Sequence, residues 1–398
     1  MNINFSKKIS LYVHFPFCQR KCAYCDFASE DWQLERIPKY TDALIYEMNL
    51  VANSLPEQIV VQTIYFGGGT PNLCGIENFR KVTRAIQEYF NTKNVIEFTV
   101  EINPGNISDK FLTTLKAEGV NRISLGCQSY NDDELQTLGR IHSSREIRRT
   151  IDQLQQTGFS NISLDFIYGI PGQTLASWQN TLDKAIQTNA THLSLYCLSY
   201  EPGTPLYQAK LRGEVQSADE ELEWRMYETA HTMLAQAGFR HYEISNWAKP
   251  GYSARHNSNY WEGGEYLGLG ASAHSFNGKQ RWWNERSVDD YIKSLPENHL
   301  PIAGREELNH SDKITEVLFL GLRTAEGLDI ARFEKLTGFK FLPILQELVN
   351  KFGGREALFI MQNKRLALTP GGWFLCDSII ENILSIIEEL KHDNPQSE

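Results

Sequence analysis

Three cysteines lie within eight residues near the start of the chain, at Cys18, Cys22 and Cys25. They follow the apolar run LYVHF, so the pattern places them on the loop after a strand. A structural zinc site uses four ligands, usually two cysteine pairs, and a catalytic zinc usually adds His or carboxylate. A cubic [4Fe–4S] cluster fits better, because three thiolates hold three irons and the fourth iron stays open. The spacing therefore favours an iron–sulfur site with one open coordination position.

Other residues suited to ligand binding stand at the ends of later strand-like runs. The run TIYFGG leads into GGGTP, and Glu101, Gln128 and Asp165 each end or follow a further run. Glycines allow the backbone to approach a ligand closely, although an isolated GGG is more often a turn. A carboxylate such as that of Glu101 can accept hydrogen bonds from a ribose or an amino group, and elsewhere it would usually be a solvated loop residue.

Alternating strand and helix patterns must position these residues. Six strand–helix units in series predict an α/β fold with a parallel sheet and right-handed crossovers. Six units are fewer than the eight of a closed barrel, so we expect a partial (β/α)6 TIM-like barrel with its chemistry at the C-terminal strand ends. The expected strands are 10–15, 63–68, 97–103, 122–128, 161–169 and 192–200, and the expected helices are 39–53, 76–90, 108–118, 145–157, 174–188 and 217–236.

The pattern changes at about residue 245, which predicts three domains. The barrel is expected over 1–245 and an extension of strands and loops with a polar linker over 246–311. A mostly helical, winged-helix-like module is expected over 312–398, where RLALTPGGW predicts a short strand and a turn between helices.

Composition limits the function further. The formal net charge of −10, without a Lys/Arg-rich patch, argues against broad nucleic-acid binding. No apolar run approaches the ~18 residues of a membrane-spanning helix, and the N-terminus shows no secretory signal. Seven cysteines with three packed together do not form a disulfide pattern. We therefore expect a cytoplasmic protein that reaches any membrane through a partner or a surface face.

The cysteine spacing followed by GGGTP resembles the radical SAM superfamily. The longer segments YVHFPFCQRKCAYCDF, YFGGGTPNL, VEINPG, RISLGCQSYND, LGRIHS, LDFIYGIPGQT, HNSNYW and LGLGASAHSF resemble its branch that contains oxygen-independent coproporphyrinogen III oxidase and a related heme chaperone. The resemblance implies a [4Fe–4S] cluster on the three cysteines and S-adenosylmethionine (SAM) on its open iron. The implied SAM-binding residues are Tyr12, Gly68, Gly69, Thr70, Glu101, Gln128, Arg140 and Asp165.

Heme is the third cofactor that the resemblance implies. His256 in HNSNYW and His274 in LGLGASAHSF are the candidate heme ligands, because histidine ligates heme iron and both lie near aromatic residues. The alternative is a structural turn in which His256 bonds to the backbone, which is the commoner use of a single histidine.

Two branches, an oxidase and a chaperone, remain to be separated. The oxidase pattern has a fourth cysteine two residues after the third, where this chain has Phe27, and it has an N-terminal extension where this chain has ten residues before its first strand run. The HNSNYW segment matches the motif of the chaperone branch. We therefore expect a heme chaperone that delivers heme to acceptor hemoproteins, membrane-bound respiratory ones included. The alternative is the oxidase, which decarboxylates coproporphyrinogen III.

Overall fold

The computed structural model describes residues 5–31, 33–55, 59–105, 107–295 and 298–393. It forms two compact units. The first comprises residues up to 240 together with 247–259 and 264–306, and the second comprises 241–246, 260–263 and the chain from 307 onward. Most of the segment expected as a separate extension, 246–311, therefore belongs to the same unit as the barrel strands.

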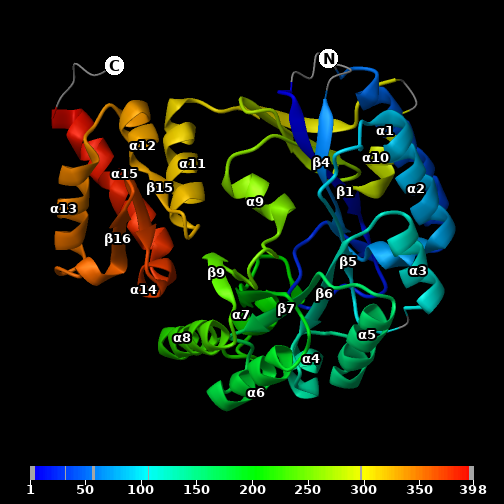
Figure 1. Ribbon diagram of the computed structural model, residues 1–398, viewed down its shortest axis with the longest axis horizontal. Helices are drawn as coiled ribbons and strands as arrows, with labels where there is room; N and C mark the ends of the chain where they lie inside the picture. Colours follow the sequence, from blue (N-terminus) through cyan, green and yellow to red (C-terminus); the bar gives the residue numbers. More distant parts are fainter. Residues whose placement is uncertain (1–4, 32, 56–58, 106, 296–297, 394–398) are drawn as a thin grey trace. The chain divides into compact units, whose positions relative to one another are not determined.

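Six parallel strands lie side by side in the first unit in the order of the sequence (Figure 1). This arrangement confirms the expected partial barrel, and each strand begins and ends within three residues of its predicted bounds. The strands are β1 (Lys8–Phe15), β4 (Val60–Gly68), β5 (Glu97–Ile102), β6 (Arg122–Gln128), β7 (Ile162–Tyr168) and β8 (His192–Cys197).

Amphipathic helices cover the outer face of this sheet. On α2 (Gly75–Tyr89), Phe79, Val82 and Ile86 are buried at helical spacing, and the Phe79 ring packs 5.4 Å from that of Phe66 on β4. Two short helices, α4 (Asp132–Thr137) and α7 (Pro205–Leu211), were not expected from the sequence. The other helices after the barrel strands are α1 (Arg36–Ala52), α3 (Asp109–Ala117), α5 (Ser144–Gln156), α6 (Leu175–Ile186) and α8 (Glu220–Gln236).

The barrel sheet continues on both sides into the region after residue 239. Next to β1 lies β11 (Tyr266–Leu269), parallel to it, followed by β12, β13 and β14. The bounds of the further strands in this sheet are β12 (His274–Phe276), β13 (Gln280–Asn284), β14 (Ile302–Glu307), β10 (Asn246–Ala248) and β9 (Arg240–Glu243). The short strands β2 (Phe17–Cys18) and β3 (Glu30–Asp31) form a separate sheet.

The expectation of strands and loops in this region, followed by a polar linker, is wrong in two places. HNSNYW lies in a helix, α9 (Arg255–Trp261), and the expected linker contains α10 (Val288–Ser294) and β14. The helix α9 forms because of a tertiary contact. The backbone N–H groups of Arg255 and His256 donate to the carboxylate of Glu97, at 2.7 and 3.0 Å, which supplies the first turn with acceptors from another strand.

A buried carboxylate connects the continuation of the sheet to the barrel through hydrogen bonds. Glu47 on α1 accepts hydrogen bonds from Tyr291 Oη at 2.5 Å, Asn284 Nδ2 at 2.6 Å and Gly270 N at 2.8 Å. These donors come from α10, β13 and the loop after β11. Burial raises the pKa of Glu47 to about 7.

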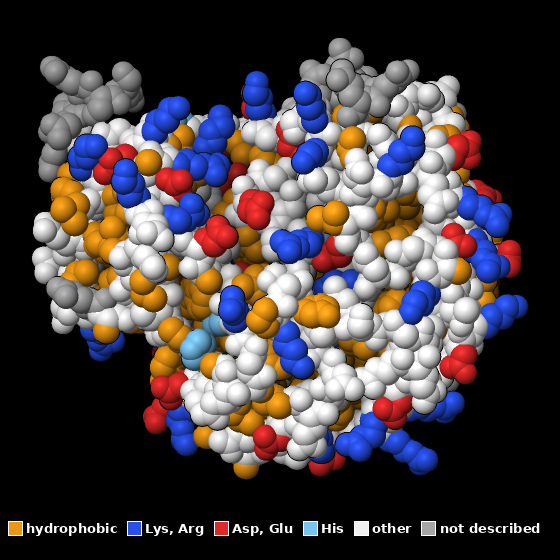
Figure 2. All heavy atoms as spheres, viewed as in Figure 1, with side chains coloured by type: hydrophobic (Ala, Val, Ile, Leu, Met, Phe, Trp, Pro, Cys, Tyr) orange, Lys and Arg blue, Asp and Glu red, His pale blue; other side chains and the backbone are white. Residues whose placement is uncertain are grey.

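The second unit is mostly helical, as the sequence predicts, and contains a small antiparallel sheet, of which the sequence predicts only the strand in RLALTPGGW. The strands lie in the order β15 (Leu328–Asp329), β17 (Arg365–Leu368) and β16 (Phe359–Gln362). The helices are α11 (His310–Leu322), α12 (Ile330–Thr337), α13 (Phe341–Lys351), α14 (Pro370–Phe374) and α15 (Cys376–Asp393). Figure 2 shows hydrophobic side chains gathered on the visible face of α13 and β16, where Leu342, Ile360 and Met361 are exposed. Among the described residues no helix has the length and apolar character needed to cross a membrane.

Candidate functional site

One cavity of 980 Å³ opens at the C-terminal ends of the barrel strands. It brings together ten of the thirteen residues that the sequence singled out as cofactor or heme contacts. Its lining includes Cys18, Cys22, Cys25, Gly68, Gly69, Thr70, Glu101, Gln128, Arg140 and Asp165. Chemistry at the C-terminal strand ends is the arrangement expected of a parallel barrel.

The cysteine loop is held in place by three different elements. Ala23 N donates to Leu138 O after α4 at 3.0 Å, and Ala23 O accepts from Leu206 N on α7 at 2.8 Å. At the far end of the loop, Nε2 of His14 on β1 lies 2.7 Å from Ala28 O. Burial lowers the pKa of His14 to about 4, so this ring is neutral near pH 7 and can donate one N–H. The two unexpected helices thus serve to hold the loop.

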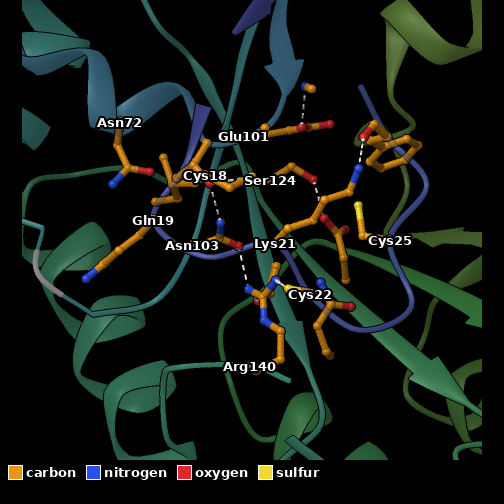
Figure 3. Close-up of a pocket in the computed structure, with 18 of the residues that line it drawn as sticks. Cys18, Gln19, Lys21, Cys22, Cys25, Asn72, Glu101, Asn103, Ser124 and Arg140 are labelled. Carbon is orange, nitrogen blue, oxygen red and sulfur yellow. Dashed lines mark hydrogen bonds between the residues drawn. The ribbon is translucent and has the colours of Figure 1, made fainter. Parts of the chain in front are cut away.

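A chain of hydrogen bonds connects two of the cysteine sulfurs (Figure 3). Thr70 Oγ1 donates toward Cys18 Sγ at 3.7 Å, and Arg140 Nη1 donates toward Cys22 Sγ at 3.4 Å. Asn103 joins the two donors, because its Nδ2 donates to Thr70 Oγ1 at 2.9 Å and its Oδ1 accepts from Arg140 Nη2 at 2.5 Å. Asn103 was not among the residues expected from the sequence, although it lies two residues after Glu101 in VEINPG.

The geometry of the three cysteines fits an iron–sulfur cluster. All three are half-buried and free, and they line the same cavity with donors directed at two of them. Burial raises the pKa of the Cys18 and Cys25 thiols in the cofactor-free protein, and binding to a metal would deprotonate them. In the described part of the chain, no three Cys, His or acidic side chains converge closely enough to hold one metal ion.

Gly68 and Gly69, at the end of β4, are required by their protein neighbours. A Cβ on Gly68, which has φ of 103°, would lie 2.3 Å from the His14 ring. A Cβ on Gly69 would lie 2.6 Å from Phe17 O and 2.7 Å from Phe15 O. The absence of side chains therefore lets β4 and the start of the cysteine loop pack together, which is a second reason beside the close approach of a ligand.

The acidic residues of the cavity are held by neighbouring hydroxyl groups. Glu101 accepts from Tyr65 Oη at 2.6 Å and from Gly68 N at 3.1 Å. Removal from bulk water raises its pKa to about 7. Asp165 accepts from Ser124 Oγ at 2.8 Å and from Ser163 Oγ at 3.1 Å, and burial raises its pKa too. Both carboxyl groups are therefore oriented in advance as hydrogen-bond acceptors for a ligand.

Gln128 has a strained backbone at the end of β6. Its φ is 66°, and the register between β6 and β7 shifts between Gly126 and Gln128. A left-handed conformation is unfavourable for a non-glycine residue, and residues strained in this way cluster at active sites and ligand sites. The bulge directs Gln128 into the cavity lining.

Tyr12 and the two candidate heme histidines do not line the cavity. Tyr12 Oη lies 3.0 Å from His14 Nδ1, so it contacts the residue that holds the cysteine loop. His256 is 1% exposed, with Nδ1 2.8 Å from Thr63 Oγ1 and its ring centroid 5.0 Å from that of Tyr65. His274 is exposed on β12, where its ring stacks on that of Trp283 at 5.7 Å. The cofactor roles assigned to these three residues stay predictions, as do those of the ten residues that line the cavity.

Comparison with known proteins identifies the class. Residues 12–185 match the family model described as the radical SAM superfamily, and residues 308–375 match the HemN C-terminal domain. The solved structure of coproporphyrinogen III oxidase (HemN) from Escherichia coli superposes with a TM-score of 0.81, covering 96% of this chain and 91% of that one at 23% identity. At that identity the likeness shows the fold alone. The class is that of the radical SAM proteins, for which SAM and a [4Fe–4S] cluster are the implied cofactors.

Sequence relatives narrow the class to a family. The heme chaperone HemW of Bacillus subtilis is 36% identical over 86% of this chain and 91% of its own length. HemW of Lactococcus lactis is 33% identical over 95% of this chain and 98% of its own. The mitochondrial radical S-adenosyl methionine domain-containing protein 1 of Danio rerio is 31% identical over 96% and 88%. The chain belongs to the HemW family.

Proposed function

We propose that this protein is a heme chaperone, which binds heme and delivers it to acceptor hemoproteins. The observation that carries the proposal is the similarity to HemW heme chaperones over nearly the whole chain. The cavity agrees with it, because Phe27 lines the cavity at the position where the oxidase pattern has its fourth cysteine. Acceptors that are membrane-bound respiratory hemoproteins are part of this proposal.

Cys18, Cys22 and Cys25 would hold the cluster in this protein, leaving one iron for the amino and carboxylate groups of SAM. When bound, the cluster supplies one-electron chemistry and a binding point for SAM. Thr70 and Arg140 donate hydrogen bonds toward the cysteine sulfurs, which stabilises negative charge there. Glu101 and Asp165 present oriented acceptors to the ribose or amino group of SAM, and Gly68, Gly69 and Gln128 shape the cavity wall around it.

Replacing any one of the three cysteines by serine should remove the brown chromophore of anaerobically reconstituted protein. Cys197→Ser is the matched control, because Cys197 lines the same cavity but lies outside the motif. Iron and sulfide analysis measures the result. Four irons and four sulfides retained in the triple variant would exclude this site.

The heme-chaperone function is tested by two measurements on the same preparation. Titration with heme should give a stoichiometric shift of the Soret band, and incubation with coproporphyrinogen III and SAM should give no decarboxylated product. Product formation that disappears in Cys18→Ser would instead establish the oxidase. Ligation of the iron by His256 or His274 would appear as a changed Soret maximum in the matching alanine variant.

A further inference from the structure

The mouth of the cavity carries an unusual group of apolar side chains. Eleven large hydrophobic side chains are exposed among the described residues, and four of them line this one cavity. These are Phe27 (68% exposed), Leu34 (67%), Ile141 (54%) and Tyr196 (43%). Single exposed apolar residues are normal, but several around one opening indicate a ligand surface. We call these four residues the apolar rim.

The rim residues come from separate elements and are more exposed than the residues proposed to face SAM. Phe27 and Leu34 lie between β2 and α1, Ile141 follows α4, and Tyr196 stands near the end of β8. The residues proposed to face SAM are less exposed, since Glu101, Gln128 and Asp165 are all half-buried. The cavity of 980 Å³ is at the upper end of the range for a site that encloses a single drug-sized ligand. This volume is consistent with SAM bound deep in the cavity and a second, apolar ligand bound at its opening.

The charges beside Phe27 indicate what kind of apolar ligand would fit. Arg20 and Lys21 are exposed, line the cavity, and form no ion pair in the part of the chain that the structure describes. Lys21 Nζ donates to Phe27 O at 3.1 Å, which holds the ammonium group at the rim. The acidic neighbour Asp26 lies 3.6 Å from Arg286, so its charge is partly balanced. Glu201, which follows Tyr196 in the chain, is a further acidic residue of the lining. A flat apolar ligand with carboxylates at one edge matches this arrangement.

We propose that the apolar rim is the heme site, with the macrocycle packed on Phe27, Leu34, Ile141 and Tyr196 and its two carboxylates paired with Arg20 and Lys21. This inference rests on the proposed heme-chaperone function and specifies its binding surface. Because neither His256 nor His274 lines the cavity, the affinity in this site comes from the ring and its carboxylates. Bound heme would cover the mouth above SAM, so the two ligands would share one cavity.

The test compares Leu34→Ser and Phe27→Ser with Leu211→Ser in the cluster-loaded protein. Leu211 is 64% exposed, nearly the same as Leu34, but does not line the cavity. Each protein is titrated with heme, with iron-free protoporphyrin IX and with heme dimethyl ester. Removing one apolar contact should weaken heme and iron-free porphyrin by about tenfold, while Leu211→Ser stays within about twofold. The double variant Arg20→Gln/Lys21→Gln should weaken heme but not its dimethyl ester.

The possible outcomes distinguish a failure of the proposed rim site from a failure of the proposed heme-chaperone function. Wild-type affinity in the rim variants, with normal iron content, would overturn the rim site and leave the chaperone role standing. Binding of heme without any binding of iron-free porphyrin would also overturn it, since affinity would then come from an iron ligand. Failure of the wild-type protein to bind heme would overturn the proposed function together with the site.

Discussion

Asn103 links the two groups that donate hydrogen bonds toward the cysteine sulfurs. Its amide fixes Thr70 through one hydrogen bond and Arg140 through another, so both donors are oriented by one side chain. Hydrogen bonds to cluster sulfurs and ligand sulfurs raise the reduction potential, because they stabilise the more negative reduced state. Asn103 is therefore a positioning residue for a property of the cluster.

Asn103→Leu should leave cluster assembly intact and lower the reduction potential of the cluster. The cysteines remain, but Thr70 and Arg140 lose their common partner, so we expect a decrease on the order of tens of millivolts. A redox titration followed by electron paramagnetic resonance measures it. Asn72→Leu is the control, since Asn72 lines the same cavity but its side-chain oxygen accepts no hydrogen bond from the described residues. An equal change in both variants, or none, would contradict this role.

Glu101→Gln should weaken SAM and remove a pH dependence. The pKa of about 7 means that the cofactor-free carboxyl becomes ionised between about pH 6 and 8, and the ionised form is the stronger acceptor. SAM affinity of the wild-type protein should therefore rise with pH across this range. The variant should bind SAM about 1–3 kcal/mol more weakly at pH 8, with a flat profile. Equilibrium dialysis at several pH values checks both, and a wild-type profile without slope would show that Glu101 does not meet SAM.

At the scale of elements, the cysteine loop depends on the contact between β1 and the end of β4. Gly69 N donates to Phe15 O at 2.7 Å, and Thr70 N donates to Phe17 O at 2.8 Å. These bonds leave no space for a side chain on Gly69.

Gly69→Ala should therefore destabilise the protein and reduce cluster occupancy. The new methyl group would meet backbone oxygens that cannot rotate away, so the strands must separate at a cost of about 1–3 kcal/mol. Thermal unfolding and iron analysis measure the two effects. In Gly75→Ala no atom lies within 4 Å of the added Cβ, so only the strain of its φ of 75° applies and iron content should stay normal. Normal iron content in Gly69→Ala would contradict the packing argument.

The Glu47 contact between α1 and the continuation of the sheet predicts a pH effect on stability. The folded pKa of about 7 lies above the unfolded value of 4.5, so the native state retains a proton that the unfolded state releases in between. The free energy of unfolding contributed by this group should fall by about 3 kcal/mol as pH rises from 4.5 to 7.

Glu47→Gln cannot ionise, so its stability relative to the wild-type protein should increase over the same pH range. Denaturant unfolding of both apoproteins at pH 5, 6, 7 and 8 gives the difference. Glu334→Gln provides a control, because a hydrogen bond from Lys340 lowers the pKa of that carboxylate, which therefore stays ionised across this pH range. A difference between wild type and Glu47→Gln that does not change with pH would contradict the raised pKa.

At the scale of the whole molecule, every residue that lines the cavity belongs to the first compact unit. A ligand that binds only the native state stabilises the part it contacts, so cofactor binding should act unequally on the two units. Addition of SAM to cluster-loaded protein should slow amide hydrogen exchange in the loops after β1, β4 and β5. Exchange in 312–393 should change much less. Equal protection in both units would show that they respond to SAM as one.

The order of the barrel strands and ten residues of the cavity lining could be predicted from the sequence. The six strands and the helices that follow them have strong hydrophobic periodicity, which depends on each segment's own residues. Parallel strands bring their C-terminal ends to one edge, so the sequence pattern alone assigns Cys18, Glu101 and Asp165 to one site. The fastening of the cysteine loop by α4 and α7 could not be predicted, because those helices are short and the contacts of Ala23 join residues far apart in the chain.

The conformation of the HNSNYW segment and the exposure of the rim residues depend on tertiary contacts. The segment shows no helical pattern of its own, and its first turn depends on the carboxylate of Glu97, more than 150 residues earlier. Exposure is also a property of the fold: Leu34 lies outside every helix and strand expected from the sequence, so no periodic pattern indicates whether its side chain is buried. Local patterns report which face of an element is apolar. Contacts between distant segments determine which buried polar group accepts hydrogen bonds from the first turn of a helix. They also determine which apolar side chains remain exposed at the opening of a cavity.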